Sequence, residues 1–261
     1  MKIHDFQAAK MAQRKISMIT CYDSTFAKIV DKTSIDCILV GDSVSMVVHG
    51  HPDTTNATLP MMVMHTAAVA RSTKKFIIAD LPFLSYRKSL SETMDAVEQL
   101  MQAGAQAVKL EGANSNAATI THIVESGIPV MGHLGLTPQS IHLLGGHKIQ
   151  GRQPSQGEVL LEQAHALQEA GCFAIVLECI PAALAKVITE SLSIPTIGIG
   201  AGPSTDGQVL VWHDLLGFDP KFKPKFLKHF ADGYSLVHTA LEDYHHQVQA
   251  LEYPVLEQHS Y

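Results

Sequence analysis

The chain has 261 residues, of which 46% are hydrophobic and 17% are charged, and its formal net charge at pH 7 is −6. This composition is typical of a globular protein and excludes a disordered or fibrous chain. The negative charge and the lack of a basic stripe argue against nucleic acid or an anionic membrane as a partner.

Secretion and membrane insertion are not predicted either. The N-terminal residues lack the continuous apolar region of a secretory signal, and no stretch of about 18 apolar residues occurs. The four cysteines form no C-x-x-C pair and mostly lie within or beside apolar runs, which favours reduced, buried thiols. We therefore expect a cytoplasmic protein.

The first element predicted in chain order is a helix over residues 1–14. Eight short apolar segments follow it and recur to the end of the chain. They are rich in Val, Ile and Leu and lack the polar alternation of a half-exposed strand, which predicts buried parallel strands covered by helices. The segments are residues 17–23, 37–42, 75–83, 107–112, 129–135, 174–180, 194–201 and 208–216.

Segments with helical spacing separate these strands. Residues 91–103 and 156–170 each place apolar side chains on one face, and Gly171 follows the second segment as a C-terminal cap. The alternation predicts the α/β class with a parallel sheet. A (β/α)8 TIM barrel needs roughly 250 residues. We therefore predict one such barrel as a single domain over residues 1–261, with the leading helix at its bottom. A doubly wound sheet is the alternative.

Four of the predicted strands end on an acidic residue. These residues are Asp42, Asp80, Glu111 and Glu178. In a closed parallel barrel all strand ends point to one face, which carries the chemistry. Carboxylates crowded there raise each other's pKa unless a cation compensates. Oxygen ligands without His or Cys favour Mg²⁺ over Zn²⁺, so the pattern predicts a magnesium site, and it favours barrel closure over the open sheet.

Each acid also has a simpler interpretation. An Asp just past a strand can cap the next helix, which applies to Asp42 and to Asp80 taken alone. Glu is a poor N-cap, so this interpretation fits Glu111 and Glu178 less well. The occurrence of all four acids at strand ends is the evidence for a functional site.

Lys109 and Glu111 lie two positions apart on one predicted strand, so their side chains project from the same face. Burying a Lys beside a carboxylate is costly unless each has a partner. The functional hypothesis is that Lys109 holds a carboxylate or oxo group of a substrate while Glu111 faces the metal. A structural salt bridge is the alternative.

Two further patterns lie near the predicted mouth. His133 lies near the end of the segment 129–135, where a substrate contact and a structural hydrogen bond are both plausible. Gly198, Gly200 and Gly202 do not fit the dinucleotide-binding spacing, because Pro203 stands where its third glycine belongs. We expect these glycines to let a ligand approach the backbone.

Two connections are long and rich in turn residues. They cover residues 49–60 and 135–157. Insertions of this kind in a compact domain are usually lids or binding loops.

Several motifs together resemble the ketopantoate hydroxymethyltransferase family. They are TCYD (20–23), VGDS (40–43), ADLPF (79–83), VKLEG (108–112), GHLGLTPQS (132–140), VLEC (176–179) and IPTIGIGAG (194–202). The resemblance runs from about residue 5 to the end. It departs at residues 49–60, which are longer than the family's turn.

The resemblance implies a (β/α)8 barrel that needs Mg²⁺ and assembles as a homodecamer, a pentamer of dimers. Asp42, Asp80 and Glu111 match the family's metal ligands, and Glu178 matches its proton acceptor. The implied reaction is that of 3-methyl-2-oxobutanoate with 5,10-methylenetetrahydrofolate and water, giving 2-dehydropantoate and tetrahydrofolate.

The resemblance also implies a binding site for the 2-oxo acid. Asp42 with Ser43, Asp80 and Lys109 match the residues that hold it, and we add His133 as a candidate contact.

Two other functions remain open from the sequence. One is a Mg²⁺-dependent lyase or mutase of the phosphoenolpyruvate mutase and isocitrate lyase type, although no cysteine-bearing loop such as KKCGH occurs. The other is a non-catalytic protein that binds 2-oxo acids, against which the presence of Glu178 beside a complete acidic set argues.

Overall fold

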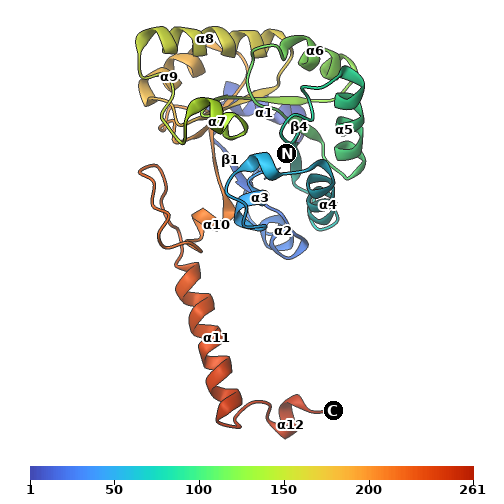
Figure 1. Ribbon diagram of the computed structural model, residues 1–261, viewed down its shortest axis with the longest axis vertical. Helices are drawn as coiled ribbons and strands as arrows, with labels where there is room; N and C mark the ends of the chain where they lie inside the picture. The colour runs from blue at the N-terminus through green and yellow to red at the C-terminus, as the bar shows by residue number, and fades with distance from the viewer. The chain divides into compact units, whose positions relative to one another are not determined.

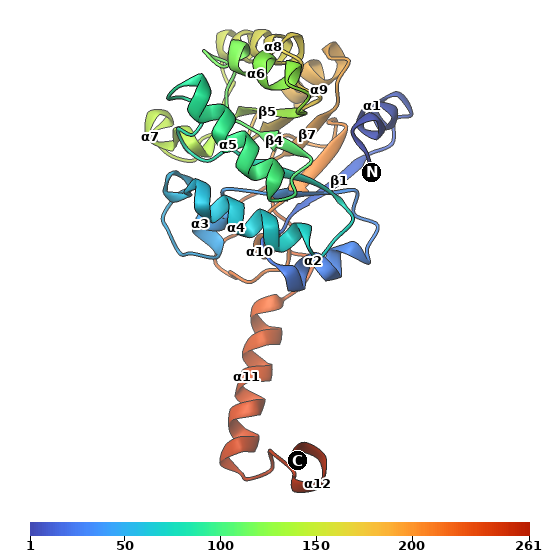
Figure 2. The same ribbon diagram turned by 90° about the vertical axis from the view of Figure 1, so that its right-hand side faces the viewer.

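The computed structural model describes residues 1–261 and contains a closed barrel of eight parallel strands in the order β1 to β8 (Figures 1 and 2). The barrel closes where Ile16 of β1 pairs with Gly207 of β8. The predicted (β/α)8 class is confirmed, and the doubly wound alternative is wrong. The strands are β1 (Ile16–Thr20), β2 (Cys37–Val40), β3 (Phe76–Asp80), β4 (Ala107–Lys109), β5 (Val130–Gly135), β6 (Ala174–Glu178), β7 (Thr196–Ile199) and β8 (Gly207–Leu210).

Helices surround the barrel, and several begin at a side-chain cap. Asp23, Thr58 and Ser89 each accept a hydrogen bond from a backbone N–H in the first turn of the helix that follows. The helices are α2 (Ser24–Asp31), α3 (Val44–Val47), α4 (Leu59–Ala70), α5 (Leu90–Gln102), α6 (Ala117–Glu125), α7 (Ile141–Leu144), α8 (Pro154–Glu169) and α9 (Ala182–Ser191). Two short 3-10 helices, η1 (Thr54–Asn56) and η2 (Pro138–Ser140), lie in the two long connections.

The leading helix α1 (Ile3–Met11) closes the end of the barrel at which the strands begin. Its Phe6 is fully buried, and its ring lies 5.3 Å from that of Phe76 and 4.9 Å from that of Phe173 in edge-on contacts. The core cluster that contains Phe6 also includes residues from all eight strands, so the prediction for this helix is confirmed. The site must therefore open at the opposite end.

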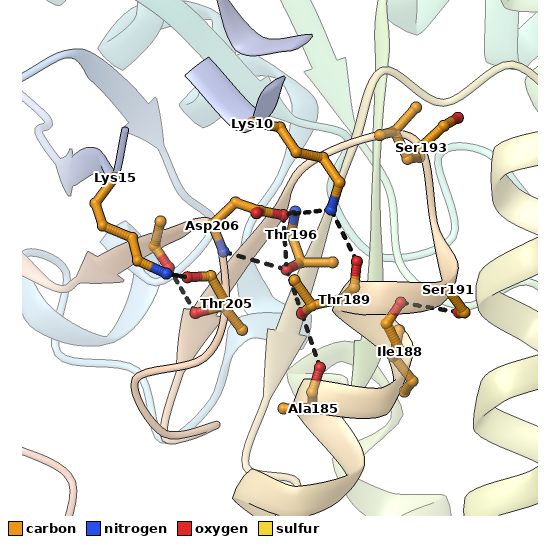
Figure 3. Close-up of polar contacts among 12 residues, drawn as sticks. Lys10, Lys15, Ala185, Ile188, Thr189, Ser191, Ser193, Thr196, Thr205 and Asp206 are labelled. Atoms are coloured by element: carbon orange, nitrogen blue, oxygen red, sulfur yellow. Dashed lines mark hydrogen bonds and ion pairs between the residues drawn. The ribbon is translucent and has the colours of Figure 1, made fainter. Parts of the chain in front are cut away.

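A polar network joins α1 to the starts of β7 and β8 (Figure 3). Lys10 Nζ donates to Asp206 Oδ2 at 2.8 Å and to the carbonyl oxygen of Thr189 at 2.8 Å. The same Asp206 oxygen accepts from the backbone N–H of Thr196 at 2.9 Å. These bonds hold the bottom of the barrel together and leave its other end free for chemistry.

Two of the glycines around β7, Gly198 and Gly202, allow close packing inside the protein, and the expected approach of a ligand to this segment stays a prediction. A Cβ on Gly202 would lie 2.5 Å from the Cβ of Ala182, and a Cβ on Gly198 would lie 2.6 Å from Thr205 Oγ1. Residues 200–206 connect β7 to β8 without a helix, so this part of the chain must pack closely against its neighbours.

The chain divides into two compact units, residues 1–211 and 212–261. The first contains the whole barrel. The second contains α10 (Trp212–Leu215), α11 (Gly233–Gln249) and α12 (Leu256–His259), so the strand predicted over 208–216 is helical in its second half. That residues 1–261 act as one domain stays a prediction. None of the helices combines the length and the apolar character needed to cross a membrane.

Candidate active site

The four acids predicted at strand ends lie at one end of the barrel. Asp80 and Glu178 are the last residues of β3 and β6, and Asp42 and Glu111 lie two positions beyond β2 and β4. The two aspartates and Glu111 are at most 4% exposed, whereas the side chain of Glu178 is 17% exposed. Burial of this many carboxylates calls for nearby positive charge.

Asp42 and Asp80 are in direct contact with each other. The backbone N–H of Asp42 donates to Asp80 Oδ2 at 3.0 Å. Neither side chain caps a helix, because Ser43 is the N-cap residue of α3 and Ser89 that of α5. Helix capping therefore does not explain either aspartate.

Lys109 supplies one buried positive charge. Its Nζ lies 3.1 Å from Asp80 Oδ1, and the two residues are paired across β3 and β4. Burial lowers the pKa of Lys109, but the negative charges of Asp80, Glu111 and Asp42 outweigh burial and raise it. The ion pair of Lys109 therefore forms with Asp80 and not with Glu111, the neighbour considered in the structural alternative, and Asp42 has no ion pair.

His133 lies between two of the acids. Its Nε2 is 3.1 Å from Glu178 Oε2, and its Nδ1 is 3.4 Å from Glu111 Oε1. Burial and the Lys109 ammonium lower the pKa of His133, but its contacts with Glu111 and Glu178 raise it to about 9. His133 Nδ1 is also 3.3 Å from Lys109 Nζ. Both nitrogens are donors when the ring is protonated, so the Nδ1–H of His133 then points to Glu111 and not to Lys109. His133 is thus the second buried cation.

The pKa values of the buried acids diverge. Burial, with the charges of Asp80 and Glu111, raises the pKa of Asp42 well above its usual range, and burial also raises that of Asp80 despite the nearby Lys109. Burial acts on Glu111 in the same direction, but His133, Lys109 and the backbone N–H of Gln139 lower its pKa. The predicted mutual increase is therefore confirmed for the aspartates and wrong for Glu111.

The donor set fits a magnesium ion. Four carboxylates face two cations, and Glu111 Oε1 is buried without a hydrogen bond. No three His, Cys, Asp or Glu residues lie close enough to hold one metal ion jointly. Mg²⁺ commonly takes one or two carboxylates and completes its shell with water and substrate oxygens, so the site suits this hard cation. The three-ligand set of Asp42, Asp80 and Glu111 stays a prediction.

Two residues that the sequence analysis did not single out join the acids. Gln139, in η2, donates from Nε2 to Asp42 Oδ2 at 2.8 Å and from its backbone N–H to Glu111 Oε2 at 3.0 Å. Tyr86 Oη donates to Gln139 Oε1 at 2.7 Å. Gln139 falls in the motif 132–140, but nothing in its local spacing indicates a site residue.

Ser43, predicted to hold the substrate, forms a hydrogen bond with the Tyr22 hydroxyl at 2.8 Å.

The two long connections meet beside the site. Asp53 Oδ2, next to η1, lies 3.7 Å from His142 Nε2 in α7. The connection 135–157 also lines a cavity of about 610 Å³, together with Arg87, Asn114 and the start of α8. A cavity of this size is ordinary for a small-molecule ligand. The connection thus has the position expected of a binding loop.

Known proteins show a full-length similarity. A family model described as ketopantoate hydroxymethyltransferase matches residues 1–255. The 3-methyl-2-oxobutanoate hydroxymethyltransferase of Legionella pneumophila strain Philadelphia 1 is 58% identical, and the alignment covers 100% of both chains. The protein of the same name from Coxiella burnetii strain Dugway 5J108-111 is 57% identical, with 100% of this chain and 99% of that one covered.

Solved structures of other enzymes share the fold. A phosphoenolpyruvate phosphomutase from Streptomyces platensis subsp. rosaceus has a TM-score of 0.65 at 12% identity, covering 100% of this chain and 92% of that one. The complex of phosphonopyruvate hydrolase with oxalate and Mg²⁺ has a TM-score of 0.62 at 14% identity, covering 82% and 81%. At these identities the likeness shows the fold alone and does not favour a lyase or mutase.

Proposed function

The chain belongs to the ketopantoate hydroxymethyltransferase family, and on that basis we propose that it transfers a hydroxymethyl group to 3-methyl-2-oxobutanoate. The one-carbon donor is 5,10-methylenetetrahydrofolate, water supplies the hydroxyl oxygen, and the products are 2-dehydropantoate and tetrahydrofolate. The observation that best supports a working site is the arrangement of its charges. Glu178 is the one partly exposed carboxylate at a mouth whose other acids are buried beside Lys109 and His133.

The buried residues bind and orient the 2-oxo acid. We assign Asp42, Asp80 and Glu111 to Mg²⁺, with Ser43 and Lys109 as contacts of the substrate. Lys109 offers a fixed positive charge to the carboxylate and keto oxygens, at a position held by its 3.1 Å contact with Asp80. Bound Mg²⁺ would add Lewis acidity, which favours loss of the proton next to the keto group.

Glu178 is the proposed general base. It takes the proton from C3, and the electron pair of that C–H bond moves toward the keto oxygen to give an enolate. Lys109 and His133 are the buried cations at this end of the barrel, 3.3 Å apart, and we assign them to oppose the growing negative charge. Water hydrolyses the methylene bridge of the folate, so that its two C–N bonds break and tetrahydrofolate and formaldehyde form. C3 of the enolate then forms a bond to the formaldehyde carbon, and the formaldehyde oxygen takes up a proton to become the hydroxyl group.

Exchange of the C3 proton tests this assignment directly. The protein is incubated with 3-methyl-2-oxobutanoate and Mg²⁺ in D₂O, and loss of the C3 proton signal is followed by ¹H NMR. We expect exchange that depends on the enzyme and on Mg²⁺, and formation of 2-dehydropantoate when 5,10-methylenetetrahydrofolate is added. An absence of exchange at high enzyme concentration would remove the proposal.

We also propose, from the family membership, that the enzyme is cytoplasmic and forms a homodecamer. The chain has a mass of 28.3 kDa. Light scattering during gel filtration measures the assembly directly, and a mass of one or two chains would contradict the proposed decamer.

A further inference from the structure

Gln139 lies at the centre of the acidic site although it carries no charge. It is 5% exposed and belongs to η2 in the long connection after β5. Its side-chain nitrogen donates to Asp42 Oδ2 at 2.8 Å and to the carbonyl oxygen of Leu81 at 2.9 Å. Its backbone N–H donates to Glu111 Oε2 at 3.0 Å. One residue therefore joins the ends of three strands.

The chemistry of its partners fixes which way the amide points. Asp42 Oδ2 and the Leu81 carbonyl oxygen are both acceptors here, so the nitrogen must face them. Gln139 Oε1 then accepts the only proton of the Tyr86 hydroxyl, at 2.7 Å. The Tyr86 oxygen is left to accept from the backbone N–H of Glu111 at 3.3 Å. Every bond in this chain has a defined direction.

Gln139 uses only one oxygen of each acid. Gln139 holds Oδ2 of Asp42 and Oε2 of Glu111, so that it does not occupy Oδ1 or Oε1. Oε1 of Glu111 is buried and has no hydrogen bond, and it lies 3.4 Å from His133 Nδ1 in an ion pair. A hydrogen bond to one oxygen of a carboxylate also fixes the direction of the second oxygen, because rotation of the carboxylate group would break that hydrogen bond.

We propose that Gln139, held by Tyr86, is a positioning residue that aims the carboxylates of Asp42 and Glu111 at the divalent cation and so at the 2-oxo acid. This inference rests on the proposed function. It adds that the connection 135–157 contributes to metal affinity from within the barrel mouth. Residues that orient metal ligands typically change affinity by about 10- to 100-fold when they are replaced.

Gln139→Met tests the inference, since Met keeps the length of the side chain and removes its donors and acceptor. Binding of Mn²⁺, used in place of Mg²⁺, is measured on the metal-free protein by electron paramagnetic resonance of the free ion. We expect about tenfold weaker binding or more. Gln106→Met is the matched control, because Gln106 bonds the backbone of Ile77 at the opposite end of the barrel. It should change Mn²⁺ affinity less than twofold.

Tyr86→Phe keeps the proposal testable if Gln139→Met does not fold. It removes only the hydroxyl that aims the amide, and we expect Mn²⁺ affinity to fall at least threefold with an unchanged circular dichroism spectrum and melting temperature. Mn²⁺ affinity within twofold of the natural protein in every folded variant overturns the inference. If the natural protein itself neither binds Mn²⁺ nor exchanges the C3 proton, the proposed function fails instead.

Discussion

His133 Nε2 lies 3.1 Å from Glu178 Oε2, while the other ring nitrogen faces Glu111. This relationship places a buried cation directly beside the proposed base. A protonated imidazole places its positive charge 3.1 Å from the side chain that we propose takes the C3 proton. It also explains why His133 sits inside the barrel, where a neutral ring would leave two acids unbalanced.

The first prediction concerns the pH dependence of stability in the metal-free protein. The pKa of His133 is raised from 6.5 to about 9 in the folded state. Its stabilising effect is therefore fully present below pH 6.5 and is lost as the pH rises through about 9. We expect a loss on the order of 3 kcal/mol across this range from His133 alone. Urea unfolding at pH 6, 8 and 10 measures it.

His133→Gln is the comparison for this experiment, because Gln does not titrate in that range. The difference in unfolding free energy between the two proteins should shrink steadily from pH 6 to pH 10. A difference independent of pH would show that His133 is neutral in the folded protein.

Much of the fold and most of the acidic site follow from local sequence. Apolar segments of six to nine residues predict the strands, and an acid at a strand end is visible without any tertiary information. The contacts of Gln139 cannot be predicted from local sequence. Gln139 lies 97 positions from Asp42 and reaches it only because the connection 135–157 folds back over the mouth of the barrel. The lowered pKa of Glu111 was missed for the same reason, as it depends on His133 from another strand.

The second prediction is that Glu178→Gln keeps substrate and Mg²⁺ binding but lowers turnover by about two orders of magnitude or more, the usual effect of removing a general base. Gln preserves the shape of the side chain and cannot take the C3 proton. Steady-state kinetics measures kcat, and C3 exchange in D₂O should fall with it. Equal kcat in the variant would assign the base to another residue.

The third prediction is that Lys109→Met destabilises the Mg²⁺-free protein by about 3–5 kcal/mol, because Asp80 would stay buried without its partner. Urea unfolding at pH 8 measures the change. Lys186→Met is the control, since Lys186 pairs with Glu190 at 3.8 Å on an exposed helix surface, where such pairs contribute about 0–1 kcal/mol. Adding Asp80→Asn to Lys109→Met should restore part of the stability. Similar losses in Lys109→Met and Lys186→Met would contradict a buried ion pair.

The fourth prediction is that Asp80→Asn weakens Mn²⁺ binding by about tenfold or more, because the variant loses an anionic oxygen donor at the site. Titration followed by electron paramagnetic resonance gives the affinity, and kcat should recover partly at high Mg²⁺. Asp36→Asn is the matched control, since Asp36 pairs with Arg14 at 2.8 Å near the bottom of the barrel and should leave the titration unchanged. If Asp80→Asn binds Mn²⁺ as the natural protein does, Asp80 is not a ligand and serves only to hold Lys109 and the backbone of Asp42.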